Sequence, residues 1–438
     1  CRYILDYMLR NILLGLGLFA TLLAVLIFSG KISVGNKVKT PEGEVMLWGT
    51  LPENEMNAIV QAFNPQAKTY AVRYKYVNEA DFNQRLLEAL ASGTGPDMIL
   101  APYQTILSQA GRLQPFPIAS FGEKAYKDTY VDGSSVFFSN QGALAFPVSI
   151  DPMVLFYNRT LFSKHGIINP PVYWDEVSTI TPSLTIRENG RFVESAIALG
   201  TPGTPYAKDI IMAIVSQLGQ TPVVRLANQL GEEYVSVQVN EPVTAGGQIL
   251  PLVTTNRFFT QFGDPSQTTY TWSQSEGNAT DRFIAEKLAM YVGYAGEFET
   301  LRARNPRGEF EMTYLPQTRG YNTFGAGMRM YGIATLKSSR NMQVAFTVQS
   351  QFAGGAVSPK IAKITGSVPA LRAYAGTQGL NVVVARTMLV AHGWYDSYEK
   401  ESSAYVASMI SDIINYRYGV NEASAVFVSR LRDLYAKK

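Results

Sequence analysis

Residues 142–176 read GALAFPVSIDPMVLFYNRTLFSKHGIINPPVYWDE. A short apolar strand opens this stretch, a lone acid, Asp151, follows in a bend, and a second strand is predicted over 153–157. An Asn-Arg-Thr turn then leads into a short helix that ends at His165 before a glycine. Two prolines precede the next helix, which begins at Trp174. The pattern predicts two short strands with Asp151 in the bend between them. Two helices follow, and glycine and proline residues separate them.

The chain before this stretch alternates strands with helices. Strand patterns occur at 45–48, 72–77 and 98–100. Apolar residues recur between them at helical spacing, at Met56, Ile59, Val60 and Phe63 and then at Phe82, Leu86, Ala89 and Leu90. Alternation of this kind predicts a parallel sheet with right-handed crossovers.

As a whole string, 142–176 resembles the bacterial extracellular solute-binding proteins of the maltose-binding type. In that family a P-x-x-x-D/E-x-x-x-L-x-Y-N-x-x-L-F segment crosses from one lobe to the other, and PPxTWDE opens a helix in the second lobe. Other segments that resemble the family are SGTGPD at 92–97, RFIAEKLAMYV at 282–292, GAGMRMYGIAT at 325–335 and SVPALR at 367–372. The resemblance covers 44–438 apart from stretches near 220–275 and 376–400.

The resemblance implies an α/β, two-lobed periplasmic-binding-protein-like fold of type II with three interlobe crossings. These crossings are expected near 147–152, 289–293 and 327–335, where they would act as a hinge. The first lobe is predicted to comprise 44–148 and 291–332, and the second lobe 149–290 and 333–438.

The composition is typical of a folded protein and argues against a nucleic-acid-binding function. Of its 438 residues, 46% are hydrophobic and 17% charged, which is typical of a globular protein. The net charge is +3 with no long basic run, so the electrostatic footprint of a nucleic-acid-binding protein is missing from the sequence. Cys1 is the one cysteine, which excludes internal disulfides and cysteine-based zinc clusters.

Residues 11–30 (NILLGLGLFATLLAVLIFSG) carry no charge and predict a transmembrane anchor. At about 1.5 Å per residue this helix would measure roughly 30 Å, the thickness of a bilayer core. Residues 1–10 would form its flank and 31–43 a polar tether. A cleaved signal peptide is the alternative, but its apolar region is usually shorter. Cys1 leaves two further interpretations open, a lipidated N-terminus and a chain that is incomplete there.

Flanking charges do not orient the anchor, because basic residues lie on both sides of it. The family resemblance instead implies that the body lies on the extracytoplasmic face of the cell membrane.

No enzymatic centre can be drawn from the residues. The two histidines, His165 and His392, stand apart from other candidate ligands, and HExxH, GxSxG, CxxC and EF-hand motifs do not occur. The sequence therefore predicts a protein that is not an enzyme and that uses neither a metal nor a cofactor.

A solute cleft instead needs a few placed polar groups and aromatic faces. Position within the family resemblance implies nine ligand-binding candidates: Trp48, Tyr103, Gln104, Asp151, Tyr206, Tyr294, Glu297, Arg329 and Trp394. Asp151 is the strongest polar candidate, with a solvated hinge acid as its alternative. Core packing is the alternative for Trp48.

The resemblance implies capture of a carbohydrate or similar polar solute by hinge closure, and delivery to an ABC permease with its ATPase. A ligand-binding sensor or adhesion subunit with the same fold and no transporter is the alternative. A glycosidase would need two cleft carboxylates about 5–10 Å apart.

Overall fold

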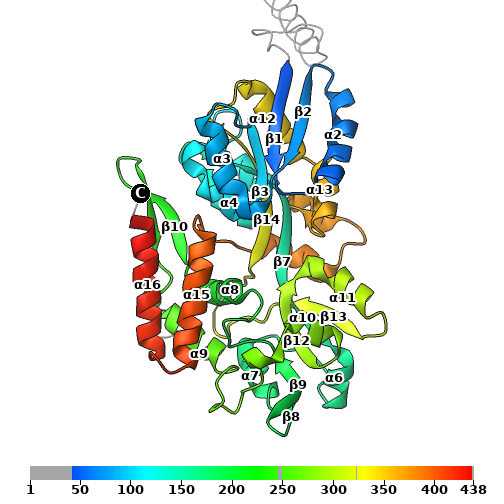
Figure 1. Ribbon diagram of the computed structural model, residues 1–438, viewed down its shortest axis with the longest axis vertical. Coiled ribbons are helices and arrows are strands. Elements are labelled where there is room, and N and C mark those ends of the chain that lie inside the picture. Colours follow the sequence, from blue (N-terminus) through cyan, green and yellow to red (C-terminus); the bar gives the residue numbers. More distant parts are fainter. Residues whose placement is uncertain (1–41, 245–248, 322, 437–438) are drawn as a thin grey trace, which may run out of the picture. The chain divides into compact units, whose positions relative to one another are not determined.

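One long strand, β7 (Phe146–Asn158), is shared by two lobes (Figure 1). The computed structural model describes residues 42–244, 249–321 and 323–436, and Gly43–Lys438 form a single unit. The first half of β7 pairs antiparallel with β14 (Met328–Thr335), whereas its second half pairs with β12 (Leu288–Tyr294). The strand therefore passes from the first lobe into the second without interruption.

A ten-stranded sheet runs through both lobes in the order β2, β1, β3, β14, β7, β12, β9, β8, with β13 and β15 also paired to β7. Its remaining strands are β1 (Gly43–Gly49), β2 (Tyr70–Tyr76), β3 (Met98–Pro102), β8 (Ile186–Glu188), β9 (Arg191–Ile197), β13 (Phe310–Tyr314) and β15 (Val368–Pro369). Strands β1, β2 and β3 are parallel, as the alternation of strands and helices predicts.

Alternation of side chains along the first-lobe strands builds two cores, one on each face of the sheet. Val45 and Leu47 of β1 contact one core, which α2 (Glu53–Ala67), α12 (Met342–Phe352) and α13 (Ser358–Ile364) cover. Trp48 points to the opposite core, beneath α3 (Phe82–Ala91) and α4 (Tyr103–Ser108). Successive residues of a strand point to opposite faces of the sheet, so the short strand β1 contributes side chains to both cores. The predicted helical faces at Met56 and Phe82 are indeed buried.

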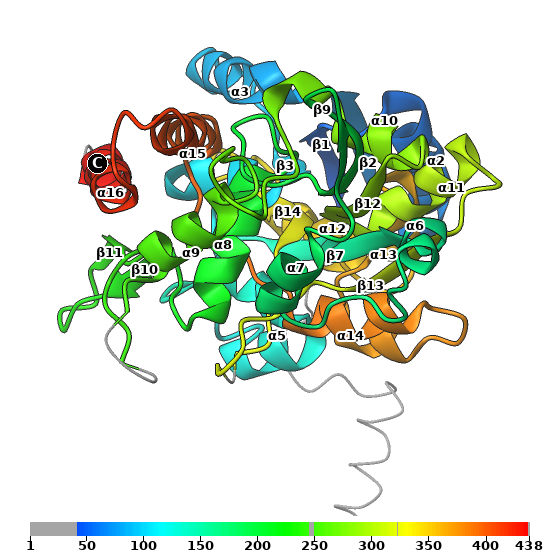
Figure 2. The same ribbon diagram turned by 90° about the horizontal axis from the view of Figure 1, so that it is seen from below.

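The second lobe is built around a buried helix, α8 (Ala207–Gln217), nine of whose eleven residues are buried. Helices α9 (Pro251–Thr260) and α15 (Glu399–Ile414) pack against it, and α16 (Val420–Ala436) packs against α9 and α15 (Figure 2). The other helices of this lobe are α6 (Arg159–Lys164), α7 (Trp174–Ile180), α10 (Ala279–Ile284), α11 (Phe298–Arg304) and α14 (Val382–Val390).

The lobes differ from the predicted division of the chain. Strands β12 and β13 pair with β7 along its second half alone, and β12 also pairs with β9 of the second lobe, so 288–314 belong to the second lobe and 289–293 do not form a crossing. Conversely, β14 pairs with β3, and α12 and α13 share a core with β1, so these elements belong to the first lobe. The chain crosses along β7, between β13 and β14, and between β15 and α14. The sequence of a buried apolar strand does not indicate which strand it pairs with. The predicted division into lobes therefore differs from the observed one.

The described residues also form two small sheets. Strands β4 (Phe116–Pro117), β6 (Gly142–Ala143) and β5 (Phe138–Ser139) pair in the first lobe, and α5 (Glu123–Thr129) lies beside them in sequence. Strands β10 (Val223–Ala227) and β11 (Glu233–Val237) form a separate antiparallel hairpin.

The predicted anchor, 11–30, lies outside the described residues. In the part of the chain that the structure describes, no helix combines the length and apolarity needed to cross a bilayer.

Candidate functional site

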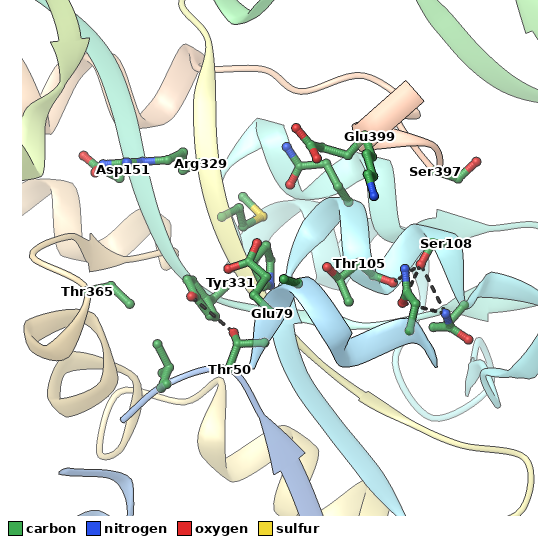
Figure 3. A pocket seen from close by; sticks show the side chains of 18 of the residues that line it. Thr50, Glu79, Thr105, Ser108, Asp151, Arg329, Tyr331, Thr365, Ser397 and Glu399 are labelled. Atoms are coloured by element: carbon green, nitrogen blue, oxygen red, sulfur yellow. Dashed lines mark hydrogen bonds and ion pairs between the residues drawn. The ribbon is translucent and has the colours of Figure 1, made fainter. Parts of the chain in front are cut away.

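A cavity of about 1150 Å³ lies between the two lobes (Figure 3). This volume exceeds the roughly 300–1,000 Å³ that is usual for pockets of small ligands. Residues from both lobes and from the hinge strands line it. They include Thr50, Glu79, Asn83, Gln104 and Tyr331 from the first lobe, Tyr206, Asp209, Tyr294, Tyr398 and Glu399 from the second, and Ser149, Asp151 and Arg329 from β7 and β14.

An ion pair between the two hinge strands forms the floor of this cleft. Arg329 Nη2 of β14 donates to Asp151 Oδ2 of β7 at 2.7 Å, and Gly296 N–H donates to Asp151 Oδ1 at 2.8 Å. Glycine is required at position 296, because a Cβ there would lie 2.4 Å from the carbonyl oxygen of Gly366. Burial raises the pKa of Asp151, while the guanidinium of Arg329 opposes that rise. The interpretation of Asp151 as a solvated hinge acid is wrong, since the residue is only 4% exposed.

Two tyrosines of the second lobe extend the floor. The guanidinium carbon of Arg329 lies 4.1 Å from the ring centroid of Tyr294, a cation–π contact, and the ring of Tyr206 meets that of Tyr294 edge-on at 4.9 Å. Tyr294 Oη donates to Asp209 Oδ2 at 2.8 Å. Tyr206 precedes α8 with a φ of +56°, an unusual conformation for a bulky residue that is found where function constrains the backbone. Burial raises the pKa of Tyr206 to about 12, so its hydroxyl is protonated at neutral pH.

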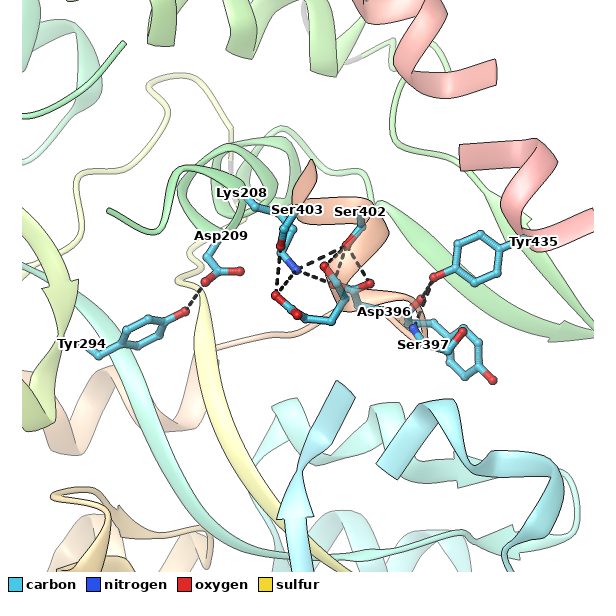
Figure 4. A network of polar contacts seen from close by, with 10 residues as sticks. Lys208, Asp209, Tyr294, Asp396, Ser397, Ser402, Ser403 and Tyr435 are labelled. Atoms are coloured by element: carbon cyan, nitrogen blue, oxygen red, sulfur yellow. Dashed lines mark hydrogen bonds and ion pairs between the residues drawn. The ribbon is translucent and has the colours of Figure 1, made fainter. Parts of the chain in front are cut away.

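A buried lysine fixes the segment that carries Tyr398 and Glu399 (Figure 4). Lys208 Nζ donates to Asp396 Oδ2 at 2.7 Å and to Glu399 Oε1 at 3.4 Å. Ser402 Oγ donates to both carboxylate oxygens of Asp396. Burial favours the neutral form of Lys208, but the combined charges of Asp396, Asp209 and Glu399 outweigh it and raise the pKa of the lysine. The start of α15 is thereby held against α8, facing the cleft.

The first-lobe wall is polar. Thr50 Oγ1 donates to Tyr331 Oη at 3.3 Å, and Gln109 Nε2 donates to Asn83 Oδ1 at 2.8 Å. Glu79 of the first lobe and Glu399 of the second both line the cavity, and burial together with the charge of Glu399 raises the pKa of Glu79. Hydroxyl, amide and carboxylate groups therefore meet tyrosine rings in one cavity, an arrangement suited to a polyhydroxylated solute.

The structure brings five of the nine predicted residues into the cleft lining: Gln104, Asp151, Tyr206, Tyr294 and Arg329. Trp48, Tyr103 and Trp394 are each at most 5% exposed and pack in the core behind it. Glu297 supports the floor from behind, because its carboxylate accepts from the Tyr294 N–H and the Tyr291 hydroxyl, both at 2.9 Å.

Several cleft residues have no sequence motif that marks them. Glu79 and Glu399 lie in the first turns of helices, where an acid is ordinary. Asp209 likewise lies in the first turn of α8. Tyr331 lies two residues beyond Arg329 on β14 and therefore on the same face, which is the one signal that could have predicted it.

The pKa of Asp209 gives a prediction for pH dependence. Burial raises this pKa above 3.8, so the folded state binds the proton more tightly than the unfolded state. The contribution of Asp209 to stability therefore falls as pH rises through the window above about 4. We expect Asp209→Asn to gain melting temperature relative to wild type between pH 4 and 7, measured by thermal denaturation.

Asp175→Asn is a control for which we expect the opposite pH dependence of stability. The hydrogen bond from Arg319 lowers the pKa of Asp175, so wild type gains stability from this group as pH rises toward 4. A constant difference between Asp209→Asn and wild type across the pH range would contradict the prediction.

Fold and cleft together define a two-lobed protein with a cavity of polar groups and tyrosine rings between its lobes, the arrangement of a solute-binding protein. The model of the bacterial extracellular solute-binding proteins matches residues 58–375, and the chain belongs to this family. Its members are binding proteins rather than enzymes. Comparison with curated proteins gives no match.

Solved structures share this fold at low sequence identity. The sugar-binding protein of Xanthomonas citri is 16% identical with a TM-score of 0.71, covering 90% of this chain and 98% of its own. The cyclic α-maltosyl-1,6-maltose binding protein of Arthrobacter globiformis is 16% identical with a TM-score of 0.71, covering 88% and 97%. An ABC substrate-binding protein of Listeria monocytogenes, in complex with cycloalternan, is 17% identical with a TM-score of 0.66, covering 91% and 100%.

Proposed function

We propose that this protein captures an oligosaccharide outside the cytoplasm and delivers it to an ABC permease and its ATPase. The observation that carries the proposal is the cleft of about 1150 Å³, which offers tyrosine rings and hydrogen-bonding side chains from both lobes. The similar structures bound to cycloalternan, maltotetraose and mannobiose support a saccharide as the solute. The size of the cavity favours several sugar units over one.

The proposed mechanism is hinge closure. Tyr206 would pack on a C–H face of the sugar with the buried Tyr294 supporting it from behind, while Gln104, Asp209 and the guanidinium of Arg329 would bond the sugar hydroxyls. Because these groups lie on different lobes and on the hinge, a bound sugar would contact more of them when the lobes approach, and would therefore favour the closed form.

The remaining parts of the proposal rest on the sequence. The uncharged segment 11–30 would anchor the protein in the cell membrane, with the body on the extracytoplasmic face. Trp48, Tyr103, Glu297 and Trp394 would act by supporting the cleft lining. The protein would return its sugar unaltered.

We expect maltotetraose or mannobiose to raise the melting temperature of the protein in a saturable manner and to reduce its radius of gyration in small-angle X-ray scattering. α-D-Tagatose serves as the single-sugar comparison and a mixture of amino acids as the control for other solutes. Chromatography of the sugar after incubation tests whether it is returned unchanged. Stabilisation by the amino acids alone, with no response to any saccharide, would contradict the proposed function.

A further inference from the structure

The β10–β11 hairpin belongs to the second lobe but also contacts the first. It packs beside α16, and Tyr395 N–H donates to the carbonyl oxygen of Val223 at 3.0 Å (Figures 1 and 2). Arg225 Nη2 reaches across to the carbonyl oxygen of Phe138 in β5 at 2.9 Å. Away from the hinge strands, the hairpin therefore forms a second link between the lobes.

Asn140, in the turn between β5 and β6, completes this link from the first lobe. Its N–H donates to Glu233 Oε1 at 3.0 Å, and its Nδ2 donates to the carbonyl oxygen of Gly231 at 2.7 Å. Arg225 Nε lies 3.7 Å from Glu233 Oε2 within the hairpin. We call the contacts of Arg225, Glu233 and Gly231 with Phe138 and Asn140 the interlobe clasp.

The clasp continues toward the cleft through Arg225. Its guanidinium carbon lies 5.4 Å from the ring centroid of Tyr395, whose carbonyl oxygen accepts from Tyr435 Oη at 2.6 Å. The next residue, Asp396, is paired with Lys208, and 397–401 line the cleft. A single side chain thus connects a first-lobe backbone to the segment that presents Tyr398 and Glu399.

We infer that Arg225 is a positioning residue for solute binding, although it contributes no atom to the cleft. Through the clasp it holds the lobes at the angle at which 397–401 face Glu79 and Gln104. Without it the lobes sample a wider range of angles, and the fraction of molecules competent to bind falls, which lowers the apparent affinity. This inference rests on the proposed capture of an oligosaccharide.

Arg282 offers a matched control inside the second lobe. Its Nη2 donates to the carbonyl oxygen of Phe192 at 3.2 Å, and its Nη1 pairs with Glu276 at 2.9 Å. The side chains of Arg225 and Arg282 are similarly buried, at 12% and 18% exposed. Both lose a bond to a backbone carbonyl and an ion pair on substitution, but only Arg225 spans the lobes.

The test compares Arg225→Ala, Arg282→Ala and wild type by maltotetraose titration calorimetry and by scattering of the sugar-free proteins. We expect Arg225→Ala to bind about tenfold more weakly, the size expected when a hydrogen bond to a charged group is lost. We also expect it to show a larger radius of gyration. Arg282→Ala should lose melting temperature while its radius and affinity match wild type.

Asn140→Ala is a second variant that tests the inference even if Arg225→Ala fails to fold. Asn140 lies in an exposed turn of the first lobe, and its substitution removes a contact of the clasp from that side. It should enlarge the sugar-free radius in the same direction. Equal radii for wild type and both clasp variants would overturn the inference, as would equal affinities for Arg225→Ala and Arg282→Ala. If wild type does not bind maltotetraose, that result counts against the proposed function, while the sugar-free radii still decide on the clasp.

Discussion

Replacing Lys208 with alanine should lower the free energy of unfolding by about 3–5 kcal/mol, the range for removing one partner of a buried ion pair. Asp396 is fully buried and would keep its charge, or take up a proton, without the ammonium 2.7 Å away. For a chain of this size the loss corresponds to a fall in melting temperature of about 4–6 °C. Thermal and urea denaturation measure it directly.

The double variant Lys208→Met with Asp396→Leu distinguishes the contribution of the ion pair to stability from that of side-chain packing. With both charges gone no buried group remains uncompensated, so the double variant should be more stable than Lys208→Ala. Because the network also holds 397–401 at the cleft, the double variant should bind maltotetraose more weakly even where its stability recovers. A single variant that melts like wild type would contradict a stabilising role for the network.

Much of the fold could be predicted because local patterns and global structure agree in the first lobe. Met56, Ile59 and Val60 lie on one face of α2, and the strand ending at Trp48 is followed by this helix, as periodicity requires. The division into lobes could not be predicted in this way. Strand β12 is buried along its whole length, and such a strand fits any neighbour that buries both its faces.

The same reason limits the prediction of the site. The family resemblance identifies where strands end near the cleft, but it does not decide which face of a buried element a side chain takes. Tyr103 and Gln104 are adjacent in α4, yet Tyr103 packs in the core and Gln104 lines the cleft. Glu79 and Glu399 are 320 positions apart in the sequence, and only tertiary structure places both in the lining of one cavity.

Asp151→Ala should be destabilising, contrary to what an exposed hinge acid would show. The carboxylate is buried, and its loss removes the partner of Arg329 and the acceptor of the Gly296 N–H. We expect a cost of about 2–3 kcal/mol, below the 3–5 kcal/mol of a fully buried pair, because the side chain of Arg329 is 44% exposed and water can solvate it. Denaturant unfolding gives this number.

Affinity should fall with stability, because Arg329 stacks on Tyr294 at the floor of the cleft and would lose the contact that orients it. Asp151→Asn is the matched control: its amide oxygen can still accept from Gly296, so it removes the charge but keeps the shape. The Asp151→Asn variant should therefore recover part of the stability that Asp151→Ala loses, while Arg329 still lacks its counter-charge. An alanine variant with the stability of wild type but weaker maltotetraose binding would instead assign Asp151 to direct contact with the sugar, and would make the ion pair energetically unimportant.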